Sequence, residues 1–429
     1  MQFKSLSAWL DWLEKNHPTE IDLGLERITR IAERMALLKP AAKVITVAGT
    51  NGKGSCVTAT AALLGAAGFS VGVYTSPHLL HYNERIVVNG NAVADADICS
   101  AFEAIYTACQ QTSVDYPSPI SLTYFEYGTL AALEIFRRQQ VTAMVLEVGL
   151  GGRLDAINII DADVAVITSI ALDHTDWLGD NREAIGYEKA GIMRADRPVV
   201  CADFSPPQSL LDHAQNLSAP LSLITRDFGY SVADDATWNW WSRDAQFSGQ
   251  PLPHLPLPSI AAALQVASIL GLDLRELDAF CCVAALRVPG RFQTLHWRDR
   301  QVILDVAHNP AATAYLVERL VQSGDVAGSK IHGIVAMMAD KDRAQSLENL
   351  KGQVSSWYVA DLAFIPRAAT VEQVRQNLVD LDVEIEFSGS VADCLQAAYK
   401  NSNSGDRILV FGSFYTVAAG LQALAAATE

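Results

Sequence analysis

Short runs of apolar residues alternate with longer stretches of helical periodicity through the first 200 residues of the chain. The apolar runs are Lys43–Val47, Ser70–Tyr74, Thr142–Val148 and Asp163–Ile170. The helical stretches between them are Cys56–Ala67, Asp95–Gln110 and Tyr124–Gln139. Runs that are apolar almost throughout are typical of strands buried on both faces of a sheet. Strand and helix in turn therefore predict an α/β fold with a mostly parallel sheet.

The same alternation restarts after residue 300 and continues to the end of the chain. The expected strands are Val302–Val306, Ile331–Met337, Trp357–Ala360, Val383–Phe387 and Arg407–Phe411. The expected helices are 311–322, 342–351, 371–379, 390–400 and a last one that ends near Ala426. This pattern predicts a second, smaller α/β domain, which has no phosphate loop of its own.

The rhythm is weaker between these two regions. From about 205 to 258, a cluster of tryptophans and a polar alternation predict a small β-rich insertion, which ends in a proline-spaced connector. Two helices, about 259–270 and 274–285, close the first domain, and Val288–Arg291 has the composition of a linker. We therefore expect an N-terminal domain at 1–287 and a C-terminal domain at 288–429.

A glycine-rich turn, Gly49–Ser55, joins the first apolar run to the helix that follows it. Such a turn exposes backbone N–H groups at the positive end of a helix dipole and suits a polyphosphate. Lys53 can reach the β- and γ-phosphates, and the Ser55 hydroxyl can ligate Mg²⁺. The standard P-loop would have a glycine in place of Val47 and a serine or threonine in place of Gly54, so this loop is a variant. The pattern predicts an ATP site, and the alternative is a plain turn with a solvated lysine.

Composition narrows the class of partner and the compartment. The formal charge of −16 and the pI of about 5.0 argue against a nucleic-acid partner, because such a partner favours a basic face. The seven cysteines show no metal-ligand spacing and are typical of reduced cytosolic thiols. The first residues carry charges within their apolar stretch, unlike a signal peptide, and there is no apolar run long enough for a membrane span. We therefore expect a soluble, cytoplasmic protein with no membrane partner.

Polar clusters follow four of the expected strands, at 49–55, 75–78, 147–155 and 173–176. The carboxyl ends of parallel strands share one edge of a sheet, so these clusters are expected to converge. Glu147 is the most informative member, because a carboxylate within an apolar strand is costly unless it is compensated, for example as a Mg²⁺ ligand. Pairing with Arg153 is the alternative. His174, taken alone, suits a metal ligand or a surface turn equally, and Ser76 suits any loop.

Eight motifs, which follow one another along nearly the whole chain, resemble those of the folylpolyglutamate synthases. They are Gly49–Ser55, Thr75–Leu79, Leu146–Asp155, Asp173–Leu178, Glu188–Ile192, Pro289–Phe292, Asp305–Pro310 and Gly412–Tyr415. The resemblance is nearest to the bacterial bifunctional dihydrofolate synthase/folylpolyglutamate synthases of the Mur-ligase-like superfamily. It implies a P-loop-containing ATPase domain and a smaller C-terminal Rossmann-like domain, in agreement with the two domains predicted above.

The resemblance implies a role for particular residues in binding ATP and metal. The triphosphate is expected to bind Gly49, Thr50, Asn51, Gly52, Lys53, Gly54 and Ser55. Ser55, Ser76 and Glu147 are expected to ligate one Mg²⁺, and His174 a second. Lys189 matches a lysine that is carbamylated in the superfamily, whereas the sequence alone favours an exposed helix lysine.

Further positions match the family's substrate loops and second domain. Arg291 and Asp305 are expected to contact ATP, and His308 and Ser413 the incoming glutamate. The pteridine is expected to lie against Asp22, Leu23, Gly24, Leu25, Thr123, Tyr124, Phe125, Glu126, Gly152, Arg153 and Leu154. The expected catalytic residues are Lys53, Lys189, Asp305 and His308. Ser259 is also counted among the expected ATP contacts, although the family usually has an asparagine there that contacts adenine, so the adenine contact is left open and ATP binding is not.

The implied activity is ATP-dependent amide formation. L-Glutamate is joined to dihydropteroate, giving dihydrofolate, and to reduced folates, giving folylpolyglutamates, through an acyl phosphate. The family also implies a monomer. A cell-wall ligase of the same superfamily would need a nucleotide-sugar-binding domain before the loop, where only about 40 residues stand. A non-catalytic ATP-binding protein, the other alternative, has no need of the five polar residues Lys53, Glu147, His174, Lys189 and His308 together.

Overall fold

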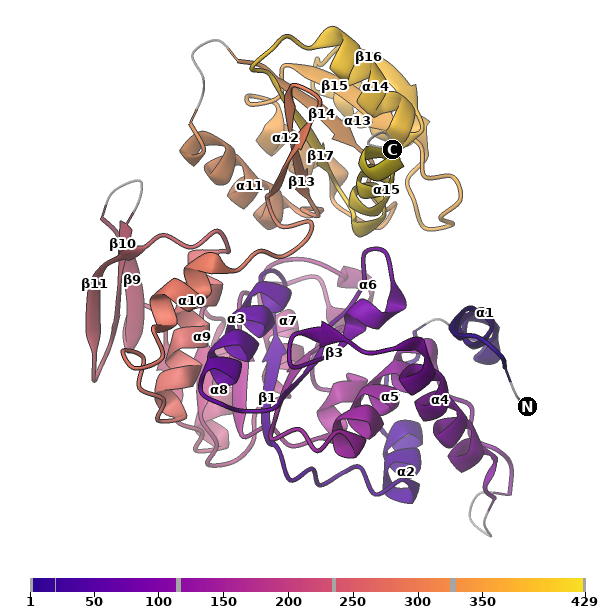
Figure 1. Ribbon diagram of the computed structural model, residues 1–429, viewed down its shortest axis with the longest axis vertical. Coiled ribbons are helices and arrows are strands. Elements are labelled where there is room, and N and C mark those ends of the chain that lie inside the picture. The colour runs from indigo at the N-terminus through magenta and orange to yellow at the C-terminus, as the bar shows by residue number, and fades with distance from the viewer. Residues whose placement is uncertain (1–2, 20, 113–116, 234–236, 325–328, 427–429) are drawn as a thin grey trace. The chain divides into compact units, whose positions relative to one another are not determined.

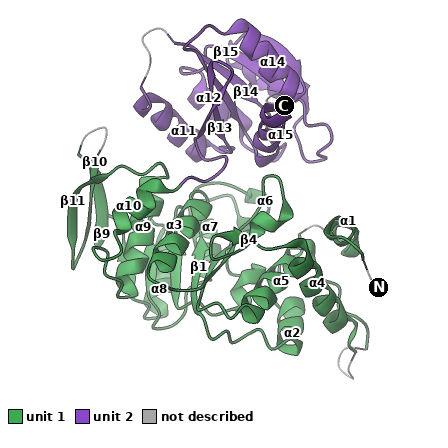
Figure 2. Cartoon of the chain, viewed as in Figure 1, with its two compact units in different colours: residues 1–286 green, residues 287–429 purple. Residues whose placement is uncertain are grey.

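The computed structural model describes residues 3–19, 21–112, 117–233, 237–324 and 329–426 (Figure 1). The chain divides into two compact units, residues 1–286 and residues 287–429 (Figure 2). The boundary lies one residue before the one expected from the sequence. Each unit contains its own mostly parallel sheet.

The main sheet of the first unit has the strand order β4-β3-β2-β5-β1-β6-β7-β8. The strands are β1 (Lys43–Ala48), β2 (Val71–Tyr74), β3 (Ile86–Val88), β4 (Asn91–Ala92), β5 (Ala143–Glu147), β6 (Val164–Ile167), β7 (Val199–Cys201) and β8 (Leu221–Leu223). The strands from β2 to β8 in this order run parallel, and β3 and β4 are added antiparallel at one edge. The expected α/β fold with a mostly parallel sheet is confirmed.

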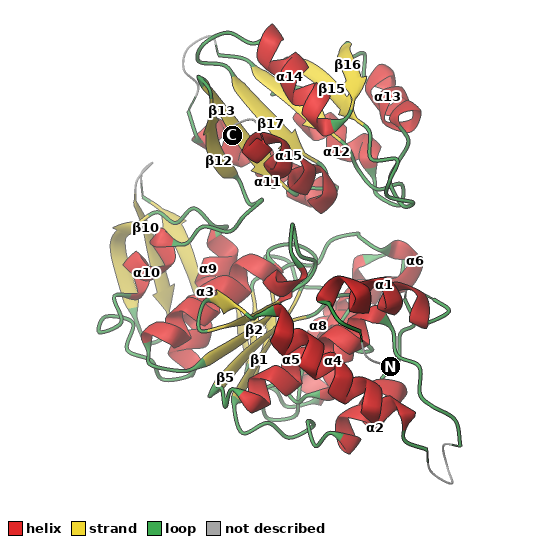
Figure 3. Ribbon diagram, turned by 45° about the vertical axis from the view of Figure 1, so that its right-hand side comes forward, coloured by secondary structure: helices red, strands yellow, loops and turns green. Residues whose placement is uncertain are grey.

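Helices cover both faces of this sheet (Figure 3). The helices of this unit are α1 (Leu6–Asn16), α2 (Glu26–Arg34), α3 (Lys53–Ala66), α4 (Asp95–Gln110), α5 (Tyr124–Arg138), α6 (Thr175–Leu178), α7 (Arg182–Ala190), α8 (Gln208–Asn216), α9 (Leu257–Ile269) and α10 (Ala279–Ala285), with the 3₁₀ turns η1 (Tyr82–Arg85) and η2 (Ala156–Ile159). On one face, Met144 and Leu146 of β5 share a core cluster with α5. The strand period of two turns Val145 and Glu147 to the opposite face, where α3 contacts β5. Glu147 therefore lies on the same side of the sheet as the helix that follows the glycine-rich loop.

Beyond β8 the chain forms a three-stranded antiparallel sheet in the order β11-β10-β9. Its strands are β9 (Phe228–Val232), β10 (Thr237–Ser242) and β11 (Gln246–Pro251). The buried Trp238 and Trp240 stack near Phe280 of α10, which explains the tryptophans of this insertion. The helix expected at 274–285 is wrong in its first part, because Asp278 has a left-handed backbone, with φ of 48°, and α10 begins after it.

The second unit has a six-stranded sheet in the order β12-β13-β17-β14-β15-β16. Its strands are β12 (Gln293–Trp297), β13 (Arg300–Asp305), β14 (Ile331–Val335), β15 (Ser356–Ala360), β16 (Ile385–Gly389) and β17 (Arg407–Phe411). Its helices are α11 (Pro310–Gln322), α12 (Arg343–Leu350), α13 (Val371–Asp380), α14 (Val391–Asn401) and α15 (Phe414–Ala426). β12 is the one antiparallel strand among the described residues of this sheet, and it forms no apolar run because its exposed and half-buried positions alternate. Within the described ranges, no helix has the length and apolar character needed to cross a membrane.

Candidate active site

Four segments meet at the carboxyl edge of the first sheet, after β1, β2, β5 and β6. Ser76, after β2, donates its backbone N–H to Oε2 of Glu147, the last residue of β5, at 3.3 Å. Thr50, after β1, donates its backbone N–H to the carbonyl of Ser169, after β6, at 2.7 Å. These contacts bring the segments together, as the parallel order of the strands predicts.

The loop after β1 has the backbone conformation that its glycines permit. Gly49 and Gly52 have φ of 151° and 84°, and Gly52 is the N-cap of α3. A Cβ atom on Gly49 would lie 1.9 Å from Oγ1 of Thr168, so the loop lies directly against the end of β6. The Nζ atom of Lys53 donates to the carbonyls of Gly49, at 2.9 Å, and Thr50, at 3.2 Å. Because Gly52 has no side chain to cap the helix, the first turn of α3 suits an anion.

Two serines and a carboxylate lie beside this loop. The Oγ atom of Ser55 is buried and has no hydrogen-bond partner among the described residues. Glu147 is 5% exposed, and its Oε2 would lie 3.8 Å from a Cβ atom on Gly54. Ser76 reaches the same Oε2 through its backbone. Hydroxyl and carboxylate oxygens are ligands that Mg²⁺ prefers, and a buried hydroxyl without a partner fits a position beside such an ion.

Arg153 does not compensate Glu147. Its guanidinium forms an ion pair with Glu188 of α7 at 2.9 Å and lies 5.6 Å from the centre of the Tyr187 ring. Its backbone N–H also donates to the carbonyl of Glu188, at 2.7 Å. The alternative of a Glu147–Arg153 pair is therefore wrong, and Arg153 instead ties the loop after β5 to α7.

Glu84 holds the loop that carries Ser76. Its carboxylate accepts the backbone N–H groups of residues 79–81, at 2.7, 2.8 and 2.7 Å. Burial raises its pKa, but these hydrogen bonds outweigh burial and leave the pKa below its usual value. Arg85 donates to Nδ1 of His78, another residue of this loop, at 2.8 Å.

Lys189 lies near the end of α7 with only 4% of its surface exposed. Burial, together with the charge of Lys53, lowers its pKa to about 7, whereas Asp173 and Asp155 act in the opposite direction. The exposed helix lysine that the sequence alone favoured is therefore wrong. These charges also place Lys189 close to the phosphate loop and to the segment after β6.

His174 begins the short helix α6 with a left-handed backbone, at φ of 51°. Its backbone N–H donates to Oδ1 of Asp173 at 2.9 Å. Trp177, one turn further, is 47% exposed. No group of three or more His, Cys, Asp or Glu side chains within the described part of the chain is arranged to hold a metal ion. A metal here would therefore depend on serine hydroxyls, single acidic or imidazole ligands and substrate oxygens.

Asp155 is a buried carboxyl that was not among the expected site residues. It accepts the backbone N–H groups of Leu150, at 2.8 Å, and Ile157, at 3.0 Å. Burial raises its pKa to about 6, although these hydrogen bonds and the charge of Lys53 lower it. A carboxyl with this pKa can hold a proton close to neutral pH. The available signal was its place at the end of the Leu146–Asp155 motif.

The expected pteridine loops lie next to one another. Arg27 forms ion pairs with Asp22, at 2.8 Å, and with Glu126, at 3.4 Å. The ring of Phe125 lies against Gly149, where a Cβ atom would approach it to 2.7 Å. The other expected residues of this group lie in the same loops or beside Arg153: Leu23, Gly24, Leu25, Thr123, Tyr124, Gly152 and Leu154.

Ser259, near the start of α9, contacts the phosphate loop directly. Its Oγ atom is buried and donates to the carbonyl of Gly52 at 3.1 Å. In this arrangement Ser259 supports the backbone of the loop.

In the second unit, Asp305 ends β13 and shapes the loop after it. It accepts the backbone N–H groups of Phe292, at 2.7 Å, and Ala307, at 2.8 Å. Burial raises its pKa, and the charge of Arg291 opposes that rise. The guanidinium of Arg291 lies 5.0 Å from the centre of the Phe414 ring. Asp305 and Arg291 therefore lie together at the carboxyl edge of the second sheet.

His308 and Ser413 differ in what their side chains can offer a ligand. Nδ1 of His308 lies 2.8 Å from the carbonyl of Val306, and since a carbonyl can only accept, Nδ1 carries the proton and Nε2 is the basic nitrogen. Ser413 is buried, and its Oγ accepts the backbone N–H of Thr416 at 3.0 Å, at the start of α15. The Ser413 side chain thus caps a helix.

Comparison with known proteins gives consistent matches over nearly the whole chain. The Mur ligase middle domain matches residues 47–203, and the Mur ligase glutamate ligase domain matches residues 290–414. The dihydrofolate synthase/folylpolyglutamate synthase of Escherichia coli is 44% identical over 96% of this chain and 94% of its own. That of Haemophilus influenzae is 37% identical over 97% and 98%.

Solved structures agree with these matches. The E. coli FolC structure in complex with DHPP and ADP is similar at a TM-score of 0.93 and 42% identity, covering 100% of both chains. A bifunctional folylpolyglutamate synthase/dihydrofolate synthase with Mn, AMPPNP and L-glutamate bound is similar at a TM-score of 0.90 and 43% identity, covering 99% of both chains.

Proposed function

The chain belongs to the dihydrofolate synthase/folylpolyglutamate synthase family of Mur ligases, and we propose that it joins L-glutamate to dihydropteroate and to reduced folates at the carboxyl edge of its first sheet. It is an ATP-dependent carboxylate–amine ligase. The observation that carries the placement of the site is the convergence of Lys53, Ser55 and Glu147 beside a helix N-terminus that has no capping side chain.

The reaction has to overcome the low reactivity of a carboxylate. An oxygen of the substrate carboxylate attacks the γ-phosphorus of ATP, ADP leaves, and an acyl phosphate forms. The neutral amine of glutamate then attacks the acyl carbon, phosphate leaves, and a proton is lost from the nitrogen. Both steps need a site without bulk water, because an acyl phosphate hydrolyses readily.

We assign the triphosphate to residues 49–55. Lys53 exchanges its hydrogen bonds to the Gly49 and Thr50 carbonyls for the β- and γ-phosphates, and there it neutralises charge during transfer. This assignment is supported by the glycine conformations of the loop and by the position of the lysine inside it. The supporting hydrogen bond from Ser259 adds a contact to the loop, and we keep the adenine contact at Ser259 as a separate hypothesis.

We assign the metal sites to oxygen ligands at the same edge. Ser55, Ser76 and Glu147 hold one Mg²⁺, and His174 contributes to a second. Bound Mg²⁺ supplies positive charge that stabilises the phosphoryl group in transit. The unpartnered Ser55 hydroxyl and its nearness to Glu147 support the first site, and the position of the His174 loop beside Lys189 supports the second.

We propose that Lys189 is carbamylated. A neutral amine adds to CO₂ with loss of one proton, and the product is a carbamate, which replaces a cation by an anion with two oxygen ligands. Most lysines are almost fully protonated at neutral pH, whereas burial gives Lys189 a pKa of about 7, so a large fraction of the amine is neutral there.

The second unit is assigned to glutamate and to further contacts with the nucleotide. Arg291 and Asp305 contact the nucleotide, and Ser413 lies in the segment that borders the glutamate. His308 accepts a proton from the glutamate amine through Nε2, since Nδ1 is committed to the carbonyl of Val306. Histidine is the side chain that most often transfers protons in enzymes, which suits this step.

The pteridine is assigned to the loops around Phe125. Asp22–Leu25, Thr123–Glu126 and Gly152–Leu154 form its surroundings, with an aromatic ring at the end of β5. We also propose a cytoplasmic protein without a nucleic-acid partner, on the grounds of its free cysteines and its net charge of −16, and a monomer, as the family implies.

The decisive experiment measures phosphate release by the purified enzyme with ATP and Mg²⁺. Dihydropteroate and tetrahydrofolate are each supplied with and without L-glutamate, and the product is identified by mass. Release that requires both the pteridine acid and glutamate is the expected result for each acid. Turnover of the folate alone would withdraw the dihydrofolate synthase activity, and release without either substrate would contradict the ligase assignment.

A further inference from the structure

The phosphate loop rests on the segment that follows β6. Oγ1 of Thr168 donates to the carbonyl of Asn51 at 2.7 Å, and Oγ of Ser169 accepts the backbone N–H of Asn51 at 3.0 Å. The side chain of Thr50 exchanges two hydrogen bonds with the backbone of Ala171, at 3.1 and 3.0 Å. The first half of the loop therefore takes its position from residues 168–171.

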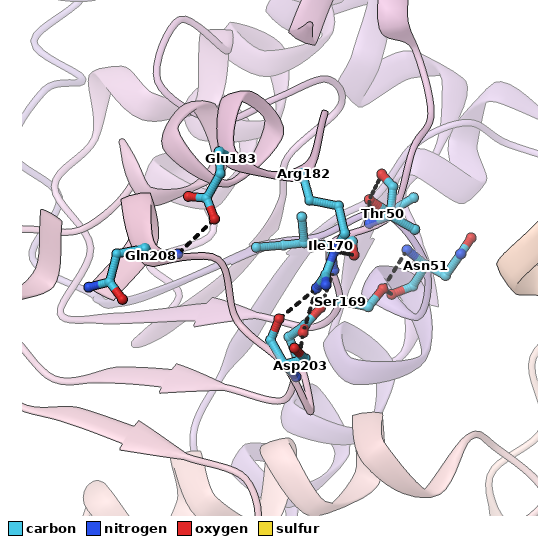
Figure 4. A network of polar contacts seen from close by, with 10 residues as sticks. Thr50, Asn51, Ser169, Ile170, Arg182, Glu183, Asp203 and Gln208 are labelled. Carbon is cyan, nitrogen blue, oxygen red and sulfur yellow. Dashed lines mark hydrogen bonds and ion pairs between the residues drawn. The ribbon is translucent and has the colours of Figure 1, made fainter. Parts of the chain in front are cut away.

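Ile170, in the middle of this segment, is held on the side away from the loop. Its backbone N–H donates to Oδ2 of Asp203 at 2.6 Å, and its carbonyl accepts Nε of Arg182 at 3.0 Å. Asp203 and Arg182 are themselves joined by an ion pair of 2.9 Å (Figure 4). The backbone N–H and carbonyl of Ile170 are thus held by two side chains, Asp203 and Arg182, that are also paired with each other.

The surroundings of this pair favour a fixed geometry. The Asp203 side chain is 8% exposed and also accepts the backbone N–H of Ser205 at 2.9 Å. Arg182 donates from Nη2 to the carbonyl of Ser205 at 2.7 Å. A charge-assisted pair with this many fixed partners loses little further entropy in holding Ile170. Arg182 is also the first residue of α7, the helix that carries Lys189 near its other end.

We propose that Arg182 and Asp203 are positioning residues that fix the phosphate loop through the backbone of Ile170. The inference rests on the proposal that residues 49–55 bind the triphosphate. The Arg182–Asp203 ion pair, called the clamp below, acts on the loop and on the segment that leads to His174. Neither of its residues is among those assigned to the nucleotide or the pteridine. Its loss should therefore affect the binding of phosphate groups and phosphoryl transfer, and leave the recognition of the pteridine unchanged.

The main test compares Asp203→Asn with Asp227→Asn. Asp227 is an equally buried carboxylate of the same unit that pairs with Arg226 and accepts the backbone N–H of Leu223, but it has no contact with residues 168–171. Both changes remove one buried charge of an ion pair, so both should reduce stability, measured by denaturant unfolding. Asp227→Asn is thus the matched control.

Asp203→Asn is expected to raise the KM for ATP and the inhibition constant of inorganic tripolyphosphate about tenfold, because a loop displaced by a fraction of an ångström loses its fit to the phosphates. The KM for tetrahydrofolate should stay within about twofold. Arg182→Lys, which keeps the charge and loses the fork, should give a smaller change in the same direction. Hydrogen exchange of peptides that span 49–52 and 168–171 should accelerate in both variants and not in Asp227→Asn.

An unchanged KM for ATP in Asp203→Asn, or an equal rise in Asp227→Asn, would overturn the proposal. If Asp203→Asn fails to fold, Arg182→Lys decides by the same measurements, since the Arg182 side chain is 40% exposed and the lysine keeps a positive charge beside the buried carboxylate of Asp203. Lys53→Ala separates the two levels of the argument. If Lys53→Ala retains tripolyphosphate inhibition, the loop assignment itself is wrong. If Lys53→Ala loses this inhibition while Asp203→Asn has an unchanged KM for ATP, only the clamp is refuted.

Discussion

Two loops of this molecule each join a parallel strand to a helix, and they differ in whether a side chain caps the helix N-terminus. After β1, Gly49 and Gly52 lead into α3 without a capping side chain. After β13, Asn309 caps α11 by accepting the backbone N–H of Ala312 at 2.9 Å, and Pro310 takes the first helical position. The strand–loop–helix topology is shared, but of these two helices only α3 begins without a side-chain cap on the amides of its first turn.

The charged side chains of the two loops also differ, with a lysine in the first and a carboxylate in the second. Lys53 lies within the first loop, whereas the second loop begins with Asp305, whose carboxylate accepts the N–H of Ala307 within the loop itself. An anion near the second loop would meet the Asp305 carboxylate, with the Arg291 guanidinium near it, and a helix N-terminus that Asn309 already caps. We infer that phosphate binding, as proposed for the first loop, depends on the residues at the strand end and not on the α/β architecture.

The strongest way to break this difference is Lys53→Ala. Turnover should fall about 10³-fold, because the charge that neutralises the moving phosphoryl group is lost. Stability should fall by about 1 kcal/mol, for the hydrogen bonds to the loop carbonyls. Steady-state phosphate release and denaturant unfolding measure the two effects. Lys351→Ala, an exposed lysine of the second unit, is the control, and near-normal turnover in Lys53→Ala would sink the assignment of the loop.

The second prediction tests Lys189, the other lysine at the first edge. Lys189→Arg should lower turnover about 100-fold, because arginine keeps a positive charge and cannot form the carbamate that presents oxygen ligands. Lys43→Arg, at an exposed position, should leave it unchanged. Carbon-13 NMR with labelled CO₂ should show a carbamate signal that is absent in Lys189→Ala. Full activity of Lys189→Arg would mean that the amine has no catalytic role.

The same lysine gives a pH dependence with a definite sign. Its lowered pKa of about 7 means that the neutral amine increases as the pH rises through 7. At a fixed, limiting concentration of dissolved CO₂, carbamate and activity should therefore rise from pH 6 to pH 8, a range given roughly as one unit on each side of the pKa. Removal of CO₂ should slow the enzyme reversibly. A pH profile that does not respond to CO₂ would contradict carbamylation.

The second edge is tested by His308→Ala. We expect the KM for glutamate to rise about tenfold and kcat to fall, because the acceptor for the amine proton is lost. Inhibition by inorganic tripolyphosphate should not change, since this edge has no phosphate loop. His296→Ala, an exposed histidine of β12, serves as the control. A selective loss of tripolyphosphate inhibition in His308→Ala would abolish the contrast between the two loops.

The smallest expected effect concerns Ser259. Ser259→Ala removes the hydrogen bond to Gly52 and should raise the KM for ATP and for GTP alike, by about threefold. Ser259→Asn offers both a donor and an acceptor to a base and should increase the preference for ATP over GTP. Competition between the two nucleotides measures this ratio. A ratio that is the same in Ser259→Asn and in the wild type would show that adenine is read elsewhere.

The elements predicted best from the sequence are those with a strong local signal. The buried strands β1 and β5 are apolar almost throughout, and α4 coincides with the expected Asp95–Gln110. The short strands β7 and β8 were not predicted, because three residues give too little pattern. Helix α10 is shorter than expected because Asp278 adopts a left-handed backbone conformation, which the sequence pattern did not predict.

The site was predictable as far as its chemistry is local in the chain. The phosphate loop and Glu147 follow directly from the pattern at two strand ends. The burial of Lys189 could not be predicted from the sequence, because it results from packing between α7 and segments more than ten residues away. Arg182 and Asp203 carry no motif, and their relation to Ile170 arises only where β6 and β7 lie side by side.

Trp177 gives this enzyme an optical signal of its own. All eight tryptophans lie within the described residues, and Trp177 is the one that is exposed. It follows His174 by three positions. Acrylamide collides with exposed indoles first, so the readily quenched part of the emission comes from the loop that carries the proposed metal ligand. Nucleotide and Mg²⁺ that settle this loop should shield the indole. Steady-state quenching can then follow ligand arrival in the unlabelled protein, without turnover.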